Sequence, residues 1–498
     1  MFLDSLKKEN NINIITTENG ATAYNSTLNA VYDLFALGGS YRTRSEEDCV
    51  FLFKKAFEEN KELALKCLFY LRDILEGQGE RRFFRVCFRW LSINFPKDAK
   101  QVMNFVPTFG RWDDLIYTTL GTSLEDDTLL IIKNQLFYDW KAEHPSLLAK
   151  WLPSENTSNK ETRKIAYKIR VGLGLDEKEY RHILSHLREK IKVLEKIMSA
   201  NRWEEVRFDK IPSIAGVRYS HAFKTREETK ERYEDFMLNK NTSVNSKTLF
   251  PTTIVKRAMD TEVKRLKLED AERINLEKCW ESLPNYYQDR EENAIAVVDV
   301  SGSMYGWQGE NRSNPIHSAI GLGIYIAERS KGPFANHFIT FSSDPKVVKI
   351  EGVDIVDKID RMEDTDWGFS TDIEAVFDLL LKTALKTETK QEELPSKIYI
   401  LSDMEFNQGL RISSTEKVES LLDSISAKWA FYGYNIPQLI FWNLEARQDN
   451  IPSLNKKFVC VSGNSPTIIK NILNGKDGYS MMLEKLNSNR YNILFEKS

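Results

Sequence analysis

Hydrophobic positions recur at helical spacing through the first half of the chain. From Ser45 to about Lys196, apolar residues fall three and four positions apart, and short loops, several with Gly or Pro, interrupt the pattern. The pattern predicts successive amphipathic helices, with examples at Ser45–Glu59, Lys61–Glu76, Glu80–Asn94 and Leu129–Glu143. Paired helices of this length favour a HEAT-like α-solenoid, in which each pair buries its apolar face against the next. An irregular helical bundle is the alternative.

Short continuous apolar runs replace this pattern in the second half. Ala294–Val298 and Ile398–Met404 predict buried strands, because a parallel sheet covered on both faces needs apolar residues in unbroken runs. Further strands are predicted at His337–Phe341, Val347–Ile350, Gln438–Trp442 and Phe458–Ser462, and helices at Ser313–Arg329, Asp372–Leu385 and Ser465–Leu473. Strands that alternate with helices indicate a doubly wound α/β sheet, so the fold class is multidomain, helical repeats followed by α/β.

Oxygen-bearing side chains follow the two predicted central strands. Asp299, Ser301 and Ser303 come directly after the first strand, and Asp403 lies at the end of the second. Thr371 lies in a turn that leads into a predicted helix. Ligand sites of open α/β sheets lie at the carboxyl ends of the strands, and carboxylate and hydroxyl oxygens suit Mg²⁺, Mn²⁺ or Ca²⁺. The set predicts a magnesium-type site; the alternative is a serine-rich turn that caps the next helix.

Three more carboxylates lie near these motifs. Asp364 and Asp366 precede Thr371 and could add negative charge near the metal, although an ordinary acidic loop is the favoured interpretation. Glu405 follows Asp403 by two residues and either supports the metal ligands or faces solvent.

The C-terminal motifs resemble a known family of domains. Asp-Val-Ser-Gly-Ser-Met at Asp299, Ser-Thr-Asp at Ser370 and the strand-end Asp403 resemble the metal-ion-dependent adhesion site of a von Willebrand factor A domain, over about residues 290–498. The resemblance implies that the five oxygen-bearing residues hold one Mg²⁺, directly or through water, and leave a position for an acidic group of a partner.

Further stretches resemble uncharacterised plant, bacterial and phage proteins whose helical N-terminal half looks related to the TROVE module of Ro ribonucleoproteins. They begin at Tyr41 (YRTR), Tyr70 (YLRDILEGQGERR), Phe109 (FGRWDDL), Lys150 (KWLPS) and Met198 (MSANRWEE). The resemblance implies an N-terminal extension over 1–40, a TROVE-like helical repeat domain over 41–290 and a von Willebrand A-like domain over 291–498. It also implies RNA binding, and helices bent into a ring that the metal-binding domain closes.

Charge and composition limit how RNA could bind. The 498 residues include 70 Lys and Arg against 73 Asp and Glu, a formal net charge of −3, so RNA binding requires a local patch. Five scattered cysteines without a Cys-x-x-Cys pair indicate reduced thiols and a cytoplasmic protein. The N-terminus has no signal-peptide core, and no run of about 18 apolar residues predicts a membrane span.

One helix carries a stripe of arginines. Arg81, Arg85 and Arg89 recur at i, i+4 and i+8, and Arg82 flanks them, which predicts a phosphate-binding patch; a solvated helix face is the alternative. The neighbouring phenylalanines are expected to fill the core. Two further basic clusters are Arg188, Lys190, Lys192 and Lys196, where glutamates interleave, and Arg218, His221, Lys224 and Arg226.

The common catalytic motifs are missing from the sequence. It has no Walker-type phosphate loop, no Gly-x-Ser-x-Gly elbow and no His-Glu-x-x-His pair, and His182 and His186 lack a third zinc ligand. We therefore expect a non-enzymatic, RNA-binding, Ro-like ribonucleoprotein component whose Mg²⁺ site binds an acidic partner. The alternative is a metal-dependent protein-interaction scaffold without RNA binding, and a metal-dependent nuclease ranks third.

Overall fold

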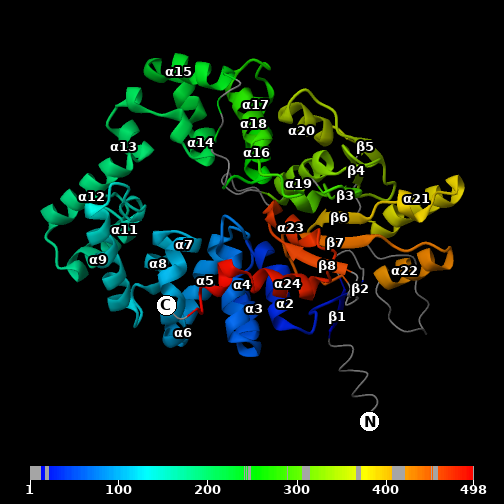
Figure 1. The fold of residues 1–498 in the computed structure, drawn as a ribbon, viewed down its shortest axis with the longest axis horizontal. Helices are drawn as coiled ribbons and strands as arrows, with labels where there is room; N and C mark the ends of the chain where they lie inside the picture. Colours follow the sequence, from blue (N-terminus) through cyan, green and yellow to red (C-terminus); the bar gives the residue numbers. More distant parts are fainter. Residues whose placement is uncertain are drawn as a thin grey trace, which may run out of the picture.

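A helical arc and an α/β domain make up the molecule (Figure 1). The computed structural model describes residues 13–16, 22–239, 242, 244, 248–288, 290–305, 314–365, 372–406, 421–449, 451–452 and 458–496. A short hairpin of β1 (Ile14–Thr16) and β2 (Thr22–Tyr24) precedes the helices. The helices of the arc are α2 (Ala30–Leu37), α3 (Glu46–Glu59), α4 (Lys61–Arg72), α5 (Arg81–Asn94), α6 (Pro96–Val102), α7 (Val106–Phe109), α8 (Trp112–Thr119), α9 (Glu125–Lys141), α10 (Leu148–Trp151), α11 (Lys160–Leu173), α12 (Glu177–Ile191), α13 (Leu194–Ser199), α14 (Ser213–Thr225), α15 (Glu227–Leu238), α16 (Pro251–Ala258), α17 (Thr261–Lys264) and α18 (Ala271–Glu281).

The sheet lies at the centre of the C-terminal domain. Its elements are β3 (Ala294–Val298), α19 (Pro315–Arg329), β4 (His337–Thr340), β5 (Val347–Lys349), α20 (Ile355–Glu363), α21 (Ile373–Thr387), β6 (Lys397–Ser402), α22 (Leu421–Phe431), β7 (Gln438–Asn443), β8 (Phe458–Ser462), α23 (Ile469–Ile472), α24 (Gly478–Leu486) and α25 (Asn489–Asn492). The described strands pair in the order β5-β4-β3-β6-β7-β8, all parallel except β5. Strands β3 and β6 are neighbours, and all their residues are buried.

Two glycines bring α19 close to its neighbours. A Cβ at Gly323 would lie 2.8 Å from a methyl carbon of Val298 in β3, and one at Gly321 would lie 2.9 Å from Pro251 in α16. Either substitution would force the packed elements apart. The helix therefore connects the sheet to the end of the helical arc.

The helical arc contacts the α/β domain at both of its ends. At its beginning, α2 packs on β8, and α24 and α25 pack on α4; at its end, α16 packs on α19. Figure 1 shows the intervening helices on a path that leaves the sheet domain and returns to it. One large hydrophobic cluster spans the first helices and the sheet, and two smaller clusters lie within α8–α12 and α13–α18.

The coarse architecture agrees with the sequence prediction of a helical region followed by an α/β domain. The strands Ala294–Val298 and Phe458–Ser462 match their predicted bounds, and β6 ends at Ser402, before the chain turns at Met404 with φ +66°. The sheet is mixed because β5 is antiparallel. HEAT-like repeats and a von Willebrand A domain stay predictions.

Several helix boundaries differ from those predicted, and α4 and α9 are two examples. Helix α4 ends at Arg72, four residues earlier than predicted. The chain then turns through Gly77 and Gly79, and φ at Gly79 is +66°. Helix α9 begins four residues earlier, at Glu125, since three acidic residues in its first turn favour the positive end of the helix dipole. In the part of the chain that the structure describes, no helix is long and apolar enough to span a membrane.

Candidate metal centre

Two buried carboxylates lie at the carboxyl edge of the sheet. Asp299 follows β3 and Asp403 follows β6, and these strands pair in parallel register. The Asp299 amide donates to the carbonyl oxygen of Leu401 at 3.0 Å, which continues the pairing one residue beyond β3. Both side chains are buried, with exposed fractions of 0% for Asp299 and 2% for Asp403. The sheet therefore brings together two groups that the sequence separates by about a hundred residues.

The turn after β3 adds two hydroxyl groups to this edge. The Ser301 amide donates to Asp299 Oδ1 at 2.9 Å, which fixes the carboxylate relative to the turn. The Oγ atoms of Ser301 and Ser303 lie 2.9 Å apart, where a short 3₁₀ helix over Gly302–Tyr305 begins. The carboxylate of Asp299 and the hydroxyl groups of Ser301 and Ser303 thus belong to one turn at this edge of the sheet.

The second strand supports Asp299 through Ser402. Its hydroxyl donates to Asp299 Oδ2 at 2.6 Å and accepts the Met404 amide at 3.1 Å. Both oxygens of Asp299 consequently accept a hydrogen bond from the protein. Sequence analysis missed Ser402, although its position directly before Asp403 on a buried strand was a usable signal.

The buried carboxylates of Asp299 and Asp403 repel each other. Burial, and then the charge of Asp403, raise the pKa of Asp299 to about 6. Arg447, which follows β7, lies beside this pair: its Nε is 3.4 Å from Asp403 Oδ2, and its Nη2 donates to the Ser303 carbonyl at 3.2 Å. Sequence analysis missed Arg447 as well, although residues that follow neighbouring parallel strands meet at one sheet edge.

The other predicted acids have different surroundings. Glu405 is buried, with its amide 3.3 Å from Asp403 Oδ1, so the solvent-facing interpretation was wrong. Asp364 is exposed and ends α20. Thr371 and Asp366 lie outside the described residues.

The donor set fits a hard divalent cation. Asp299, Ser301, Ser303 and Asp403 supply only oxygen, the donor type that Mg²⁺ and Ca²⁺ select. Among the described residues, no three or more His, Cys, Asp and Glu side chains cluster in a way that could hold a metal ion. A cation at this edge would therefore need the serine hydroxyls as well as the two carboxylates.

The predicted arginine stripe is mostly engaged within the helical region. Arg85 forms ion pairs with Asp113 at 2.7 Å and Asp114 at 2.6 Å, and Arg89 donates to the Leu120 carbonyl at 2.6 Å. Arg82 donates to the sulfur of Cys49, and Arg81 is exposed. The neighbouring phenylalanines Phe83, Phe84 and Phe88 are buried, as expected. RNA binding by the four arginines stays a prediction, with Arg81 the most accessible of them.

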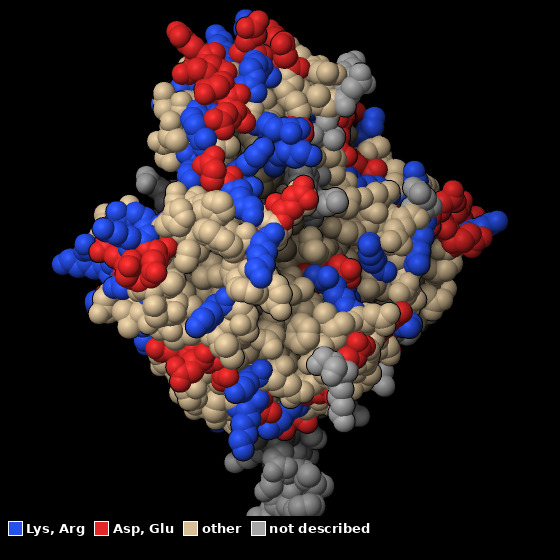
Figure 2. Space-filling model, turned by 60° about the vertical axis from the view of Figure 1, so that its left-hand side comes forward, with Lys and Arg blue, Asp and Glu red and all other residues tan. Residues whose placement is uncertain are grey.

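Charges of both signs are mixed on the surface. Figure 2 shows Lys and Arg interspersed with Asp and Glu on the face it presents, without a continuous basic area. The second cluster is likewise paired in part, since Lys190 donates to the Ala142 carbonyl and Lys196 pairs with Glu189. In the third cluster, Lys224 pairs with Asp270.

All five cysteines, Cys49, Cys67, Cys87, Cys279 and Cys460, are free and buried. The rings of His182 and His186 stack 6.3 Å apart beside Trp140, as a structural pair would.

Comparisons with known proteins match nearly the whole chain. Residues 293–492 match the model of a domain of unknown function, DUF7788, and residues 17–115 and 146–289 match that of a second, DUF2828. The uncharacterized protein L728 of Acanthamoeba polyphaga mimivirus is 30% identical over 98% of this chain and 89% of its own length. The crystal structure of the Deinococcus radiodurans RO (RSR) protein superposes on this chain with a TM-score of 0.43. The two sequences are 12% identical, and the match covers 93% of this chain and 99% of the other.

Proposed function

We propose that this chain, which belongs to the same family as mimivirus protein L728, binds an acidic partner through a divalent cation. The proposal rests on one observation: Asp299, Asp403 and the turn that carries two serine hydroxyls all lie at the carboxyl edge of the sheet. Asp299, Ser301, Ser303 and Asp403 would hold Mg²⁺, and Thr371 is the further ligand that the motif predicts.

Electrostatics favours this function over a purely structural turn. Two buried carboxylates at one sheet edge cost free energy unless a positive charge offsets them. Arg447 contacts Asp403, while Asp299 is surrounded by serine donors that stabilise it without neutralising it. A bound cation would neutralise the pair and attract a carboxylate or phosphate of the partner. The role is bridging, so we propose no catalytic residue.

Metal binding by purified protein tests the proposal. Titration with Mn²⁺, followed by its electron paramagnetic resonance signal, should show one site per chain that Mg²⁺ competes for. Asp299→Asn and Asp403→Asn should each weaken binding at least tenfold, and Asp364→Asn, which changes an exposed carboxylate directly after α20, should leave it unchanged. A folded wild-type chain that binds no Mn²⁺ at millimolar concentration would contradict the proposal.

RNA binding is the second candidate, and exposed aromatic rings on α9 support it. Phe137, Tyr138 and Trp140 are 59%, 67% and 42% exposed. The Lys141 ammonium lies 4.1 Å from the centre of the Phe137 ring, and the His186 ring lies 4.5 Å from that of Trp140. Aromatic rings beside cations are the surfaces on which single-stranded bases stack. The sequence prediction placed RNA on the arginines of α5, whereas the α9 surface offers stacking as well as charge.

Fluorescence anisotropy with a single-stranded oligoribonucleotide separates the two functions. Binding through α9 should weaken as salt rises and should persist in EDTA, because phosphate contacts release counterions and need no metal. The pair Phe137→Ala and Tyr138→Ala should lower affinity at least tenfold. Leu130→Ala removes a 56% exposed apolar side chain of the same helix and should have little effect. Equal losses in both variants would count against base stacking.

A further inference from the structure

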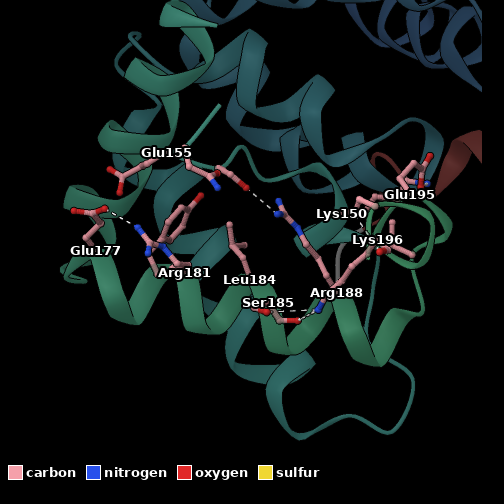
Figure 3. Close-up of a pocket in the computed structure, with 14 residues that line it drawn as sticks. Lys150, Glu155, Glu177, Arg181, Leu184, Ser185, Arg188, Glu195 and Lys196 are labelled. Atoms are coloured by element: carbon pink, nitrogen blue, oxygen red, sulfur yellow. Dashed lines mark hydrogen bonds and ion pairs between the residues drawn. The ribbon is translucent and has the colours of Figure 1, made fainter. Parts of the chain in front are cut away.

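A pocket of about 510 Å³ opens between α12 and the segments on either side of it. Its walls come from Lys150 in α10, the loop around Ser154, one side of α12 and the first residues of α13. Figure 3 shows Arg188 between Leu184 and Lys150, with Lys196 close by. The volume lies within the range of small-molecule sites, and the pocket lies in a different part of the chain from the carboxyl edge of the sheet.

The carboxylates that line this pocket already have cationic partners. Glu177 pairs with Arg181 at 2.8 Å, and Glu195 pairs with Lys150 at 3.5 Å. Glu155 pairs with Arg170 at 2.9 Å. The negative charge in the wall is therefore offset before Arg188 is counted.

Arg188 has no carboxylate within ion-pair distance among the described residues. Its Nε donates to the Ala149 carbonyl at 2.8 Å, its Nη2 to the Leu152 carbonyl at 2.7 Å, and its Nη1 to Ser154 Oγ at 2.8 Å. Burial lowers the pKa of Arg188, which is the effect of holding a cation away from water. The pocket thus contains a guanidinium whose charge the surrounding protein does not neutralise.

A structural role accounts for part of this arrangement. The two carbonyl groups belong to the end of α10, where a cation also interacts favourably with the helix dipole. A guanidinium has five N–H groups, and the three bonds to protein leave one each on Nη1 and Nη2. Arg188 can therefore hold α10 and still offer two N–H groups to the oxygens of an anion.

A cluster of ion pairs that includes Lys196 borders the pocket. Lys196 and Arg202 share the carboxylate of Glu189, at 2.9 Å and 3.0 Å. Their hydrogen bonds, that of Lys196 first, hold the pKa of Glu189 at about 2. Because Arg202 also pairs with Glu205 at 3.4 Å, two cations meet two carboxylates in this cluster, and among the described residues Arg188 remains the guanidinium of the pocket without a carboxylate partner.

We propose that this pocket binds the phosphate group of a small phosphorylated ligand. Arg188 supplies the two donors, and the ammonium groups of Lys150 and Lys196, each paired with a glutamate, line the same pocket. Hydroxyl groups of Ser154, Ser185 and Ser199 line the same space and can donate to phosphate oxygens. The pocket volume leaves room for the remainder of a ligand the size of a nucleotide. The pocket shares no lining residue with the metal centre or with α9.

Calorimetric titration with inorganic phosphate, AMP and adenosine tests the phosphate requirement. AMP should bind, phosphate should bind more weakly and compete with it, and adenosine should not bind. Arg188→Gln and Lys150→Gln should each lower AMP affinity at least tenfold. Lys178→Gln removes an exposed lysine of the same helix and should change nothing, and Asp299→Asn should retain AMP binding even if metal binding is lost.

Binding of oligoribonucleotides shows whether the phosphate belongs to an RNA end or to a free nucleotide. An oligoribonucleotide with a 5′-phosphate that binds more tightly than its 5′-hydroxyl form, and competes with AMP, would identify an RNA end as the ligand; equal binding of the two forms would favour a free nucleotide.

Arg188→Gln could unfold α10, so circular dichroism accompanies each variant, and Lys150→Gln, which leaves the carbonyl contacts of Arg188 in place, provides the independent test. Wild-type chain that binds neither AMP nor phosphate at millimolar concentration, or folded variants that both bind AMP like wild type, would overturn the proposal.

Discussion

Arg490 forms a two-point ion pair with Asp73, 417 residues earlier in the sequence, and so joins α25 to the end of α4. Asp73 is fully buried, and it also accepts the hydroxyl of Tyr491 at 3.0 Å. These contacts stabilise one of the two interfaces between the helical arc and the α/β domain. They explain why α25, at the end of the α/β domain, packs within the helical half.

Removal of this carboxylate should destabilise the whole molecule. Asp73→Ala leaves the Arg490 guanidinium without its partner, and we expect the free energy of unfolding to fall by about 3 kcal/mol. Urea denaturation measures the change, and a double-mutant cycle with Arg490→Ala measures the coupling between the two residues. Strictly additive effects would show that the pair contributes nothing beyond its separate side chains.

Substitution of Arg447 should tighten metal binding. Arg447→Met removes a positive charge beside Asp403, and we expect affinity for Mn²⁺ to rise about three- to tenfold. The effect should shrink as salt is added, because the Arg447 side chain is 36% exposed. Weaker binding in the variant would instead show that Arg447 positions Asp403 for the metal.

Arg85 should matter for stability and not for RNA. Arg85→Gln removes charged hydrogen bonds to the fully buried Asp114, and we expect a loss of about 2 kcal/mol in the free energy of unfolding. Arg81→Gln, at an exposed position of the same helix, should leave stability unchanged. RNA affinity measured on both folded variants shows whether the stripe binds phosphate; a loss confined to Arg85→Gln would contradict this assignment.

His317 should make the fold sensitive to mild acid. Burial, and then the charge of Lys256, lower the pKa of His317 to about 4, against about 6.5 in an unfolded chain. As the pH falls below 6.5 the unfolded state takes up the proton first, so stability is lost between pH 6.5 and 4. We expect this residue to account for a loss of about 2 kcal/mol between pH 7.5 and pH 5.

The comparison of wild type with His317→Gln isolates this effect. Glutamine can still accept the Asn314 amide that now donates to His317 Nδ1 at 3.0 Å. Urea unfolding at both pH values should show the variant gaining on wild type as the pH falls, while His144→Gln, at an exposed site, should follow wild type. A constant gap between wild type and His317→Gln at the two pH values would refute the assignment.

The strand ends were predictable because they depend on local patterns. Asp299 and Asp403 follow unbroken apolar runs, and parallel strands place such ends at one edge. The arginines were not predictable in the same way. Helical spacing placed Arg81, Arg85 and Arg89 on one face, but it contained no information about the acidic turn of α8 that neutralises Arg85.

Arg188 shows the same limit from the other side. Interleaved glutamates made its cluster look solvated, whereas the fold pairs those acids with other cations and leaves Arg188 against the carbonyls of α10. Ring closure also depends on contacts between distant segments, such as Gly39 with Ser462, that a helical period does not encode.

The pairing of Asp73 with Arg490 has a consequence for the order in which the protein forms during translation. A ribosome that adds about 5–20 residues per second needs roughly 20 to 80 s to make the chain between them. Throughout that interval α4 exposes the surface that α24 and α25 later cover, with an acidic group at its end that lacks its arginine. The interface between the two halves therefore cannot close until the segment that contains Arg490 has been made.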